Sequence, residues 1–470
     1  MLVHTRRHDG VRFLDEEGKV LPKSPQTFNA FAVFSGGTVI GTLGGLIGLG
    51  GAEFRLPLLI GLFGFGVVGE GLYKVLEQTQ SLNARIKRVC IKNPGKKRNA
   101  PDALFTTDKN ELLNDEEINV IVEVIDDSVA AYEIVSTALK NKKDVVSASK
   151  KMLAENLPAL LELQKQTGQS LLYEAAACAS IPVIRNLEEY YDNDLLHAIK
   201  AIVNGSTNFI LTKMFEDKLD FQQALILAQQ LGFAESNPKL DVEGFDAVNK
   251  WTLLLNHAYG IVERPENIVF NGIQNITAAD AKVAAEKNYQ IKLVAQAQKL
   301  SNGKVAAYVI PQFVKADDHL AFVKNEYNGV VIESGFADKQ FFYGKGAGSF
   351  PTASAVLSDI SALRYHYQYE YKKLYHHKPH ELSDELFVRV YVSFDDLNLI
   401  PKDKFEWIEE WHAQEQRKYL VGVIAFSELR NSNWWKENGT SLILTPDPVI
   451  EEVETRKIKK KSLELAGVLL

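Results

Sequence analysis

Cysteine is scarce in this chain, whose 470 residues include only Cys90 and Cys178. Two cysteines cannot build a disulfide framework or a zinc cluster, so their scarcity favours a reducing compartment such as the cytoplasm. A strong charge of either sign is also missing, because the formal net charge is -7. Nucleic acid is therefore not expected as a partner. Between Ser24 and Ala52 there is no charged residue at all.

The uncharged N-terminal stretch is apolar and glycine-rich, and it reaches the roughly 20 residues that a bilayer-crossing helix needs. Its segment Gly44-Gly-Leu-Ile-Gly-Leu-Gly-Gly51 lies in residues 27–62, which resemble the start of sulfite-exporter-like (TauE/SafE) membrane proteins. One such segment cannot form a transporter. We expect residues 1–54 to be an extension that does not span a membrane productively. Membrane contact of residues 24–62 and an ordinary flexible extension are the alternatives.

Residues Leu58–Gly61 belong both to the exporter-like segment and to an apolar strand that leads into a glycine pattern. The segment Ile60-Gly-Leu-Phe-Gly64-Phe65-Gly66-Val67-Val68-Gly69 joins an apolar strand to G-x-G-x-x-G, and a helical pattern follows. Gly64 permits a tight turn, Gly66 lets a pyrophosphate approach the backbone, and Gly69 lets the helix pack on the sheet. The pattern predicts a dinucleotide-binding turn, although any glycine-rich strand-to-helix turn could mimic it.

The next expected strand is 88–92, and the residues around its end favour NADP over NAD. An acidic residue about 20 positions beyond the glycines would hold a ribose 2′-hydroxyl. Residues 85–101 contain no Asp or Glu, and the cations Lys92, Lys96, Lys97 and Arg98 stand there instead. Cations suit a 2′-phosphate. A plain basic surface loop is the alternative.

Further apolar runs complete the expected parallel sheet. Ile118–Ile125 and residues 144–148 are typical of buried strands, and residues 130–139 have a helical pattern. Ligands gather at the carboxyl ends of such strands. Ser147 and Lys150 therefore stand where cofactor binding and chemistry are expected, although a lysine is more often a surface residue.

Four later segments occur in the order found in homoserine dehydrogenases, which the chain resembles over about residues 58–365. They are Tyr173-Glu-Ala-Ala-Ala-Cys-Ala-Ser-Ile-Pro182, Asn204-Gly-Ser-Thr-Asn208, Leu231-Gly-Phe-Ala-Glu-Ser-Asn-Pro-Lys-Leu-Asp241 with its continuation to Lys250, and Gly344-Lys-Gly-Ala-Gly348. The resemblance implies reversible NAD(P)H-dependent reduction of aspartate 4-semialdehyde to homoserine, on the route to threonine, isoleucine and methionine. It also implies a homodimer.

Reduction of an aldehyde needs a hydride donor and a cation or acid at the developing alkoxide. By resemblance, Lys150 and Lys250 handle the proton, and Asp246 orients Lys250 and the substrate. Lys250 follows Asp246 by four residues, so the two side chains can meet on one helix face. A structural ion pair on a solvated helix would look the same.

The resemblance also implies the remaining ligand contacts. The substrate residues are Glu235, Asp241, Asn204, Gly205, Ser206 and Thr207. A monovalent cation, usually sodium, would take Glu174 and the backbone carbonyls of Ala177, Ala179 and Ile181. Gly346 would lie near the nicotinamide. Cys178 and Ser180 replace glycines of the family, so the cation loop should differ if those glycines need positive φ.

The expected fold class is α/β. A Rossmann-type NAD(P)-binding domain at 55–185 precedes a catalytic and dimerisation domain at 186–366. A C-terminal α+β module follows at 380–470, with strand patterns at 385–393, 419–426 and 440–444 and a helical pattern at 403–414. This order resembles small ACT-like regulatory modules. The rival hypotheses are another NADP-dependent dehydrogenase, a membrane-associated fusion that relocates or disables the enzyme, and an inactive binding module.

Overall fold

The computed structural model describes residues 57–192, 195–414 and 417–451. The chain divides into Met1–Pro57 and Leu58–Leu470, and the description below concerns the second unit. The expected extension at 1–54 and its membrane contact lie outside the described residues. Leu58–Gly61, which two interpretations shared, is part of strand β1 (Leu58–Phe63) of a parallel sheet. No helix in the described ranges is long and apolar enough to cross a membrane.

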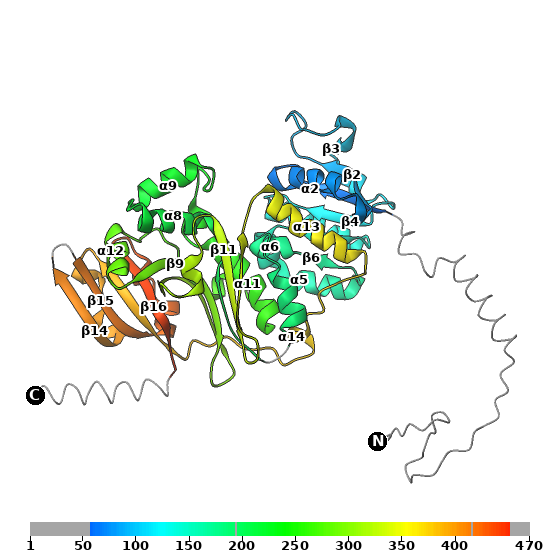
Figure 1. Cartoon of the computed structure of the whole chain (residues 1–470). Helices are drawn as coiled ribbons and strands as arrows, with labels where there is room; N and C mark the ends of the chain where they lie inside the picture. Colours follow the sequence, from blue (N-terminus) through cyan, green and yellow to red (C-terminus); the bar gives the residue numbers. More distant parts are fainter. Residues whose placement is uncertain (1–56, 193–194, 415–416, 452–470) are drawn as a thin grey trace, which may run out of the picture. The chain divides into compact units, whose positions relative to one another are not determined.

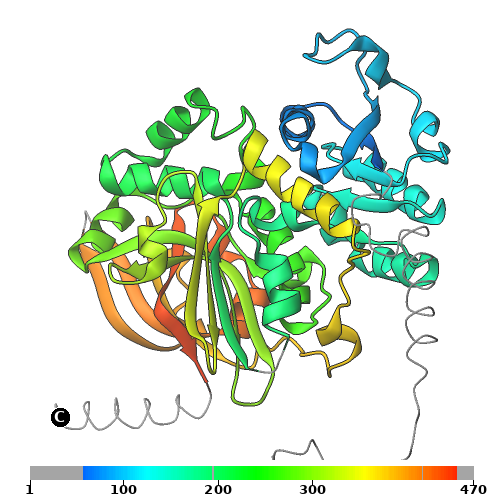
Figure 2. The ribbon, with the colours of Figure 1, turned by 45° about the vertical axis from the view of Figure 1, so that its right-hand side comes forward.

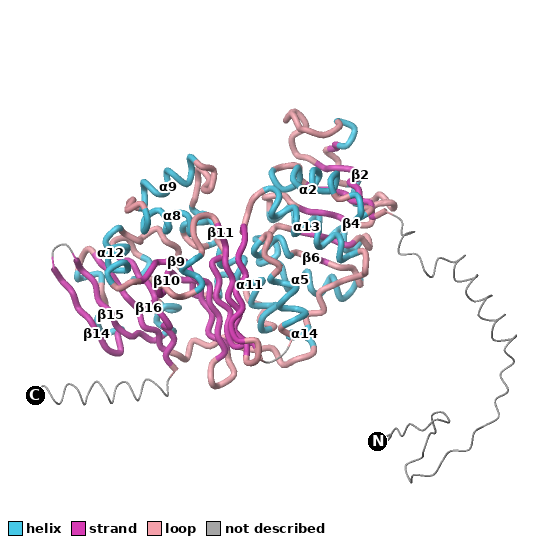
Figure 3. The backbone as a smooth tube through the Cα atoms, viewed as in Figure 1, coloured by secondary structure: helices cyan, strands magenta, loops and turns pink. Residues whose placement is uncertain are grey.

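The first half of this unit is a doubly wound parallel sheet with strand order β3-β2-β1-β4-β5-β6 (Figures 1 and 3). Its elements are β2 (Ala84–Cys90), β3 (Phe105–Thr106), β4 (Val120–Glu123), β5 (Asp144–Ser147), β6 (Leu171–Leu172), α2 (Val67–Gln78), α3 (Asn110–Leu113), α4 (Ser128–Lys140) and α5 (Lys150–Thr167). All four residues of β4 are buried, as expected for a strand covered on both faces. The predicted strands at 118–125 and 144–148 and the helix at 130–139 are confirmed.

One helix of this layer comes from far along the chain. Helix α13 (Ser349–Leu363) lies beside α2, as Figures 1 and 2 show. The Ser349 hydroxyl donates to the Val67 carbonyl at 2.7 Å. A Cβ atom on Gly71 would lie 2.5 Å from the Ser349 hydroxyl oxygen, so glycine permits this close approach. The nucleotide-binding layer therefore includes residues well beyond the expected boundary at 185.

The second half is built on a ten-stranded sheet with the strand path β12-β11-β7-β9-β10-β16-β13-β15-β14 and β8 beside β10. Its strands are β7 (Leu196–Ile202), β8 (Val269–Phe270), β9 (Tyr289–Lys299), β10 (Val305–Lys315), β11 (Tyr327–Ser334), β12 (Asp338–Lys345), β13 (Phe387–Phe394), β14 (Phe405–Gln414), β15 (Arg417–Ala425) and β16 (Thr440–Ile450). Its helices are α6 (Glu174–Cys178), α7 (Val183–Arg185), α8 (Gly205–Glu216), α9 (Phe221–Gln230), α10 (Lys239–Val242), α11 (Phe245–Tyr259), α12 (Ala278–Glu286), α14 (Lys372–Tyr375) and α15 (Phe426–Asn431). Helices α8, α11 and α12 pack against β9.

The C-terminal strands extend this sheet, since β16 pairs with β10. The helix predicted at 403–414 is wrong, because that segment is strand β14. Register shifts at Phe405/Trp407 and Ile408/Glu410 interrupt its pairing with β15. Each shift adds one extra residue to the strand, so side chains on the same face of β14 lie three residues apart instead of two. Phe405, Ile408 and Trp411 have this spacing, which resembles that of a helix. Three strands now precede the single helix α15, so the ACT-like order is not supported.

Candidate functional site

Two lysines from distant segments meet on one buried aspartate. Lys150 is the first residue of α5, whereas Asp246 and Lys250 lie on α11. The Nζ atom of Lys150 is 2.6 Å from Oδ1 of Asp246, and the Nζ atom of Lys250 is 2.8 Å from Oδ2. The structure thus brings together the three residues that the sequence assigned to catalysis.

The charges in this cluster stabilise one another. Burial alone would raise the pKa of Asp246, but the charges of Lys150 and Lys250 outweigh burial and hold that pKa well below its ordinary value. The charge of Asp246 in turn raises the pKa of Lys150. Lys250 also donates to the Val203 carbonyl at 2.8 Å. At neutral pH a carboxylate therefore holds a protonated Lys150 at the end of the parallel sheet.

Asn204 joins the cluster to a second aspartate. Its side-chain oxygen accepts the Thr207 N–H at 2.8 Å and so caps α8. Its amide nitrogen donates to Oδ1 of Asp241 at 2.6 Å and to Oδ2 of Asp246 at 2.8 Å. Burial, together with the nearby charge of Asp246, raises the pKa of Asp241. Sequence resemblance placed Asn204 on the substrate, and the structure adds that it orders both aspartates.

Of the other residues predicted to bind the substrate, some lie at the start of α8 and one lies away from the cluster. A Cβ atom on Gly205 would lie 2.5 Å from the Glu326 carbonyl, so α8 can start there only with glycine. The Ser206 hydroxyl donates to the Phe233 carbonyl at 2.6 Å. Glu235 is exposed on the loop after α9, and its carboxylate makes no hydrogen bond or ion pair within the described residues. The structure therefore does not bring Glu235 into the cluster.

The glycine turn has the local geometry that its spacing predicted. Gly64 has φ +96, and a Cβ atom on Gly69 would lie 2.2 Å from the Gly64 carbonyl oxygen. A Cβ atom on Gly66 would meet nothing within 4 Å. No side chain caps the start of α2, so its first N–H groups are available to an anion. The close contact of Gly64 and Gly69 forms the tight turn, and the open space beside Gly66 leaves room for a pyrophosphate.

The basic segment after β2 borders an open cavity of about 630 Å³. Lys96 and Lys97 line this cavity, are exposed, and form no ion pair within the described residues. Arg98 lines it too, but its guanidinium is turned onto the backbone, where it donates to the Asn93 and Lys96 carbonyls at 2.7 Å. Lys92 is exposed outside the cavity lining. Arg98 therefore shapes a loop that presents two unpaired lysines.

Ser147 was expected to contact the cofactor, but it is buried and its hydroxyl is already used. It donates to Oε2 of Glu123 at 2.6 Å. Glu123 is fully buried at the end of β4, and burial raises its pKa to about 7. Sequence reasoning missed this residue. The available signal was that Glu123 is the single charged residue in the apolar run Ile118–Ile125.

Comparisons with known proteins identify the family of the chain. A family model described as homoserine dehydrogenase matches residues 182–361, and a model of the homoserine dehydrogenase NAD-binding domain matches residues 64–174. The homoserine dehydrogenase of Bacillus subtilis is 35% identical over 313 residues, which cover 65% of this chain and 72% of the relative. That of Synechocystis is 34% identical and is covered over 73% of its length.

The chain belongs to the homoserine dehydrogenase family.

Solved structures of family members match a larger share of the chain. The homoserine dehydrogenase of Thiobacillus denitrificans has a TM-score of 0.70 at 26% identity, with 83% of this chain and 98% of that chain covered. A hyperthermophilic archaeal homoserine dehydrogenase solved with NADPH has a TM-score of 0.57 at 26% identity, with 67% and 99% covered. The chain is thus an oxidoreductase with a nicotinamide cofactor. The comparisons give no support to the exporter-like resemblance of residues 27–62, and the matched models begin at residue 64.

At the loop expected to hold a cation, Glu174 lies close to Arg185 of α7 and to a second buried acid, Asp359 of α13. The carboxylate of Glu174 accepts the N–H groups of Ile184 at 2.8 Å and Arg185 at 2.9 Å. Asp359 pairs with the Arg185 guanidinium at 2.9 Å. Burial, reinforced by the charge of Glu174, raises the pKa of Asp359 to about 7, and burial also raises that of Glu174. The cluster therefore holds more negative than positive charge when both acids are ionised.

The cation loop and the loop at Gly344–Gly348 are tied together. Positive φ falls on Ala179 at +44, and neither Cys178 nor Ser180, which replace family glycines, has it. The Ser180 hydroxyl donates to the Lys345 carbonyl at 2.9 Å. A Cβ atom on Gly346 would lie 1.9 Å from the Asn328 amide nitrogen, so only glycine fits there.

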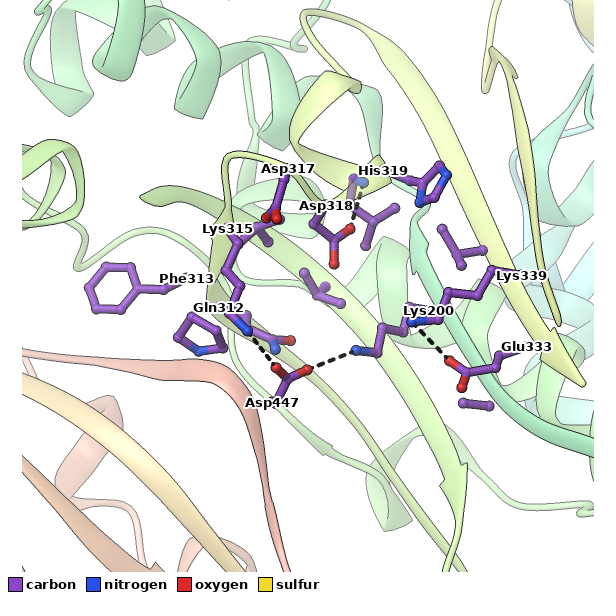
Figure 4. A pocket seen from close by; sticks show the side chains of 16 residues that line it. Lys200, Gln312, Phe313, Lys315, Asp317, Asp318, His319, Glu333, Lys339 and Asp447 are labelled. Atoms are coloured by element: carbon purple, nitrogen blue, oxygen red, sulfur yellow. Dashed lines mark hydrogen bonds and ion pairs between the residues drawn. The ribbon is translucent and has the colours of Figure 1, made fainter. Parts of the chain in front are cut away.

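A cavity of about 290 Å³ on the ten-stranded sheet lies apart from these residues (Figure 4). None of the predicted site residues lines it. Asp447 pairs there with Lys315 at 2.9 Å and Lys200 at 3.8 Å, and Lys339 lies 3.6 Å from Glu333. Because these lysines are already paired with carboxylates, the cavity does not compete with the lysine cluster as the catalytic site.

Proposed function

We propose that the cluster of Lys150, Asp246 and Lys250 carries out the reversible reduction of L-aspartate 4-semialdehyde to L-homoserine. The supporting observation is one buried carboxylate that holds two lysines at the carboxyl end of the parallel sheet. NADPH, when bound, supplies the hydride that adds to the aldehyde carbon. The aldehyde oxygen then needs a proton and nearby positive charge, and the cluster provides both.

The chain's own residues divide this work. The two ammonium groups stabilise the developing alkoxide and deliver the proton, while Asp246 fixes their positions. Asp241 accepts from the substrate's ammonium group, and the turn Asn204–Thr207 receives its carboxylate. Glu235 is the second acid by resemblance alone. In the reverse direction one of these lysines, in its deprotonated form, takes the hydroxyl proton from homoserine.

Oxidation of NADPH in the presence of aspartate 4-semialdehyde tests this function directly, with NADH as the comparison. Turnover that requires both substrates, together with homoserine as the product, is the expected result. A protein that binds NADPH but leaves the semialdehyde unchanged would be an inactive binding module instead.

We also propose NADP as the preferred cofactor, with NAD as the alternative, because Lys96 and Lys97 are unpaired beside an open cavity. The double substitution Lys96→Ala/Lys97→Ala should raise the Kd for NADPH roughly tenfold, since hydrogen bonds to charged groups are lost. The Kd for NADH should change less than twofold. Fluorescence titration measures both, and Lys140→Ala/Lys142→Ala, on the exposed end of α4, is the matched control. Equal losses for the two cofactors would contradict the assignment.

We further propose a monovalent cation, sodium by resemblance, at Glu174 and the carbonyls of Ala177, Ala179 and Ile181. The excess of buried negative charge supports it, because a monovalent cation and the Arg185 guanidinium together would balance the charges of Glu174 and Asp359.

Sodium or potassium chloride at tenfold its Kd should stabilise the protein by about 1.4 kcal/mol relative to tetramethylammonium chloride. The effect should be larger at pH 8 than at pH 6, because the pKa of Asp359 is about 7 and its protonation removes charge. Thermal unfolding at constant ionic strength is the measurement. Glu174→Gln should abolish the effect, whereas Glu155→Gln, on the exposed face of α5, should keep it. The same shift in both variants would exclude the site.

The resemblance also supports a homodimer in the cytoplasm. Sedimentation equilibrium measures the first, and cell fractionation measures the second.

A further inference from the structure

Glu123 lies where two functional loops leave the parallel sheet. It is the last residue of β4, is fully buried, and forms no ion pair with a lysine, arginine or histidine in the described ranges. A buried carboxyl group without a counter-ion is costly, so its retention in a core needs a reason beyond packing. Asp126 is the charged group that acts on it, and it disfavours ionisation.

The two oxygens of Glu123 hold different loops. Oε1 accepts the Ile125 N–H at 2.7 Å, in the loop that follows β4. Oε2 accepts the Ser147 hydroxyl at 2.6 Å, and the Ser147 oxygen accepts the Ser149 N–H at 3.1 Å. Glu123 is therefore linked, through the Ser147 side chain, to the backbone N–H of Ser149, the residue immediately before Lys150.

Backbone bonds also shape this turn, since the Ala148 N–H donates to the Glu123 carbonyl and the Lys150 N–H donates to the Ala148 carbonyl, both at 3.1 Å. The link through Ser147 adds the contact that holds the Ser149 N–H. The side chain of Ser149 does not cap α5, although it stands at the N-cap position. The side chain of Lys150 is 43% exposed, and its recorded ion pair is the one with Asp246. The direction in which Lys150 leaves the backbone thus depends on the turn Ser147–Ser149.

We propose that Glu123 is a positioning residue that, through Ser147, sets the placement of Lys150 for hydride-transfer chemistry. The inference rests on the proposed function of Lys150. The ionised carboxylate accepts both hydrogen bonds, whereas the protonated form gives up one acceptor position. The placement of Lys150 should therefore follow the protonation of Glu123.

The first test replaces the link. Ser147→Ala should lower kcat roughly tenfold with little change in KM, because small displacements of a catalytic group are costly. Ser147→Thr keeps the hydroxyl and should restore most of the rate. Ser136→Ala removes a similar buried serine of α4, whose hydroxyl bonds only the Glu133 carbonyl, and should leave kcat unchanged. A Ser147→Ala enzyme with wild-type kcat and a lowered Tm would overturn the proposal.

The second test does not depend on turnover. Lysines are reductively methylated with ¹³C, and the Lys150 signal is assigned by its loss in Lys150→Arg. In the wild type the signal should shift with a midpoint near pH 7, and in Glu123→Gln this shift should disappear. A shift that persists in Glu123→Gln would refute the inference. A wild-type protein that lacks turnover but shows the expected shift would refute the proposed function and leave the positioning role supported.

Discussion

Alanine in place of Lys250 is expected to lower kcat by about three orders of magnitude, within the range typical of a lost general acid. The substitution removes a nearly buried ammonium that contacts Asp246 and the Val203 carbonyl. Lys150→Ala should have an effect of similar size, because the two lysines share one carboxylate. Initial rates of NADPH oxidation with saturating aspartate 4-semialdehyde measure both.

Two controls separate chemistry from folding. Lys151→Ala removes the neighbouring exposed lysine, which lies 3.8 Å from Glu155, and should keep full activity. Far-ultraviolet circular dichroism should be unchanged in all three variants, and the Kd for NADPH should be unchanged in Lys250→Ala and Lys151→Ala. If either Lys150→Ala or Lys250→Ala turns over within tenfold of wild type, that lysine is not part of the proton-transfer machinery.

Glu123→Gln should remove a large pH dependence of stability. The pKa of Glu123 is about 7 in the folded chain, against an ordinary value of 4.5. Between these values the folded chain binds more protons than the unfolded one, so the free energy of unfolding falls as pH rises. The fall amounts to about 3 kcal/mol and is complete above pH 7. Glutamine is neutral at every pH and should flatten that slope.

Urea unfolding at pH 5, 6, 7 and 8 measures the difference between wild type and variant. The comparison isolates Glu123, because other titrating groups such as Asp359 are present in both proteins. Glu116→Gln, an exposed position in the same layer, should keep the wild-type slope. Parallel curves for wild type and Glu123→Gln would contradict the assigned pKa.

Local patterns explain what the sequence could predict. The glycine turn, the strand β4 and the helix α4 depend on residues a few positions apart, and each was found where its pattern indicated. Asp246 and Lys250 could be paired for the same reason, since they lie one helical turn apart. The position of Lys150 at the end of a parallel strand placed it where ligands of such sheets gather, and only the family resemblance joined it to the other two residues.

Features that depend on contacts between distant parts of the sequence could not be predicted in this way. Nothing near Ser349 in the sequence indicates that α13 packs on α2. The bulges of β14 arise from its pairing with β15, so its apolar spacing was misread as helical. Glu235 was placed by resemblance alone, and the structure leaves it exposed. Glu123 was visible as a charge inside an apolar run, but its partner Ser147 lies on another strand.

The position of α13 has a consequence for how the protein folds during its synthesis on the ribosome. Strand β1 and helix α2 emerge early, yet the helix that covers α2 does not begin until Ser349. At about 5–20 residues per second, the uncovered face of α2 waits for roughly 15–50 s of synthesis. During that interval a nascent chain exposes an apolar surface of its nucleotide-binding layer. Folding of the nucleotide-binding layer should therefore be complete only after α13 has been synthesised.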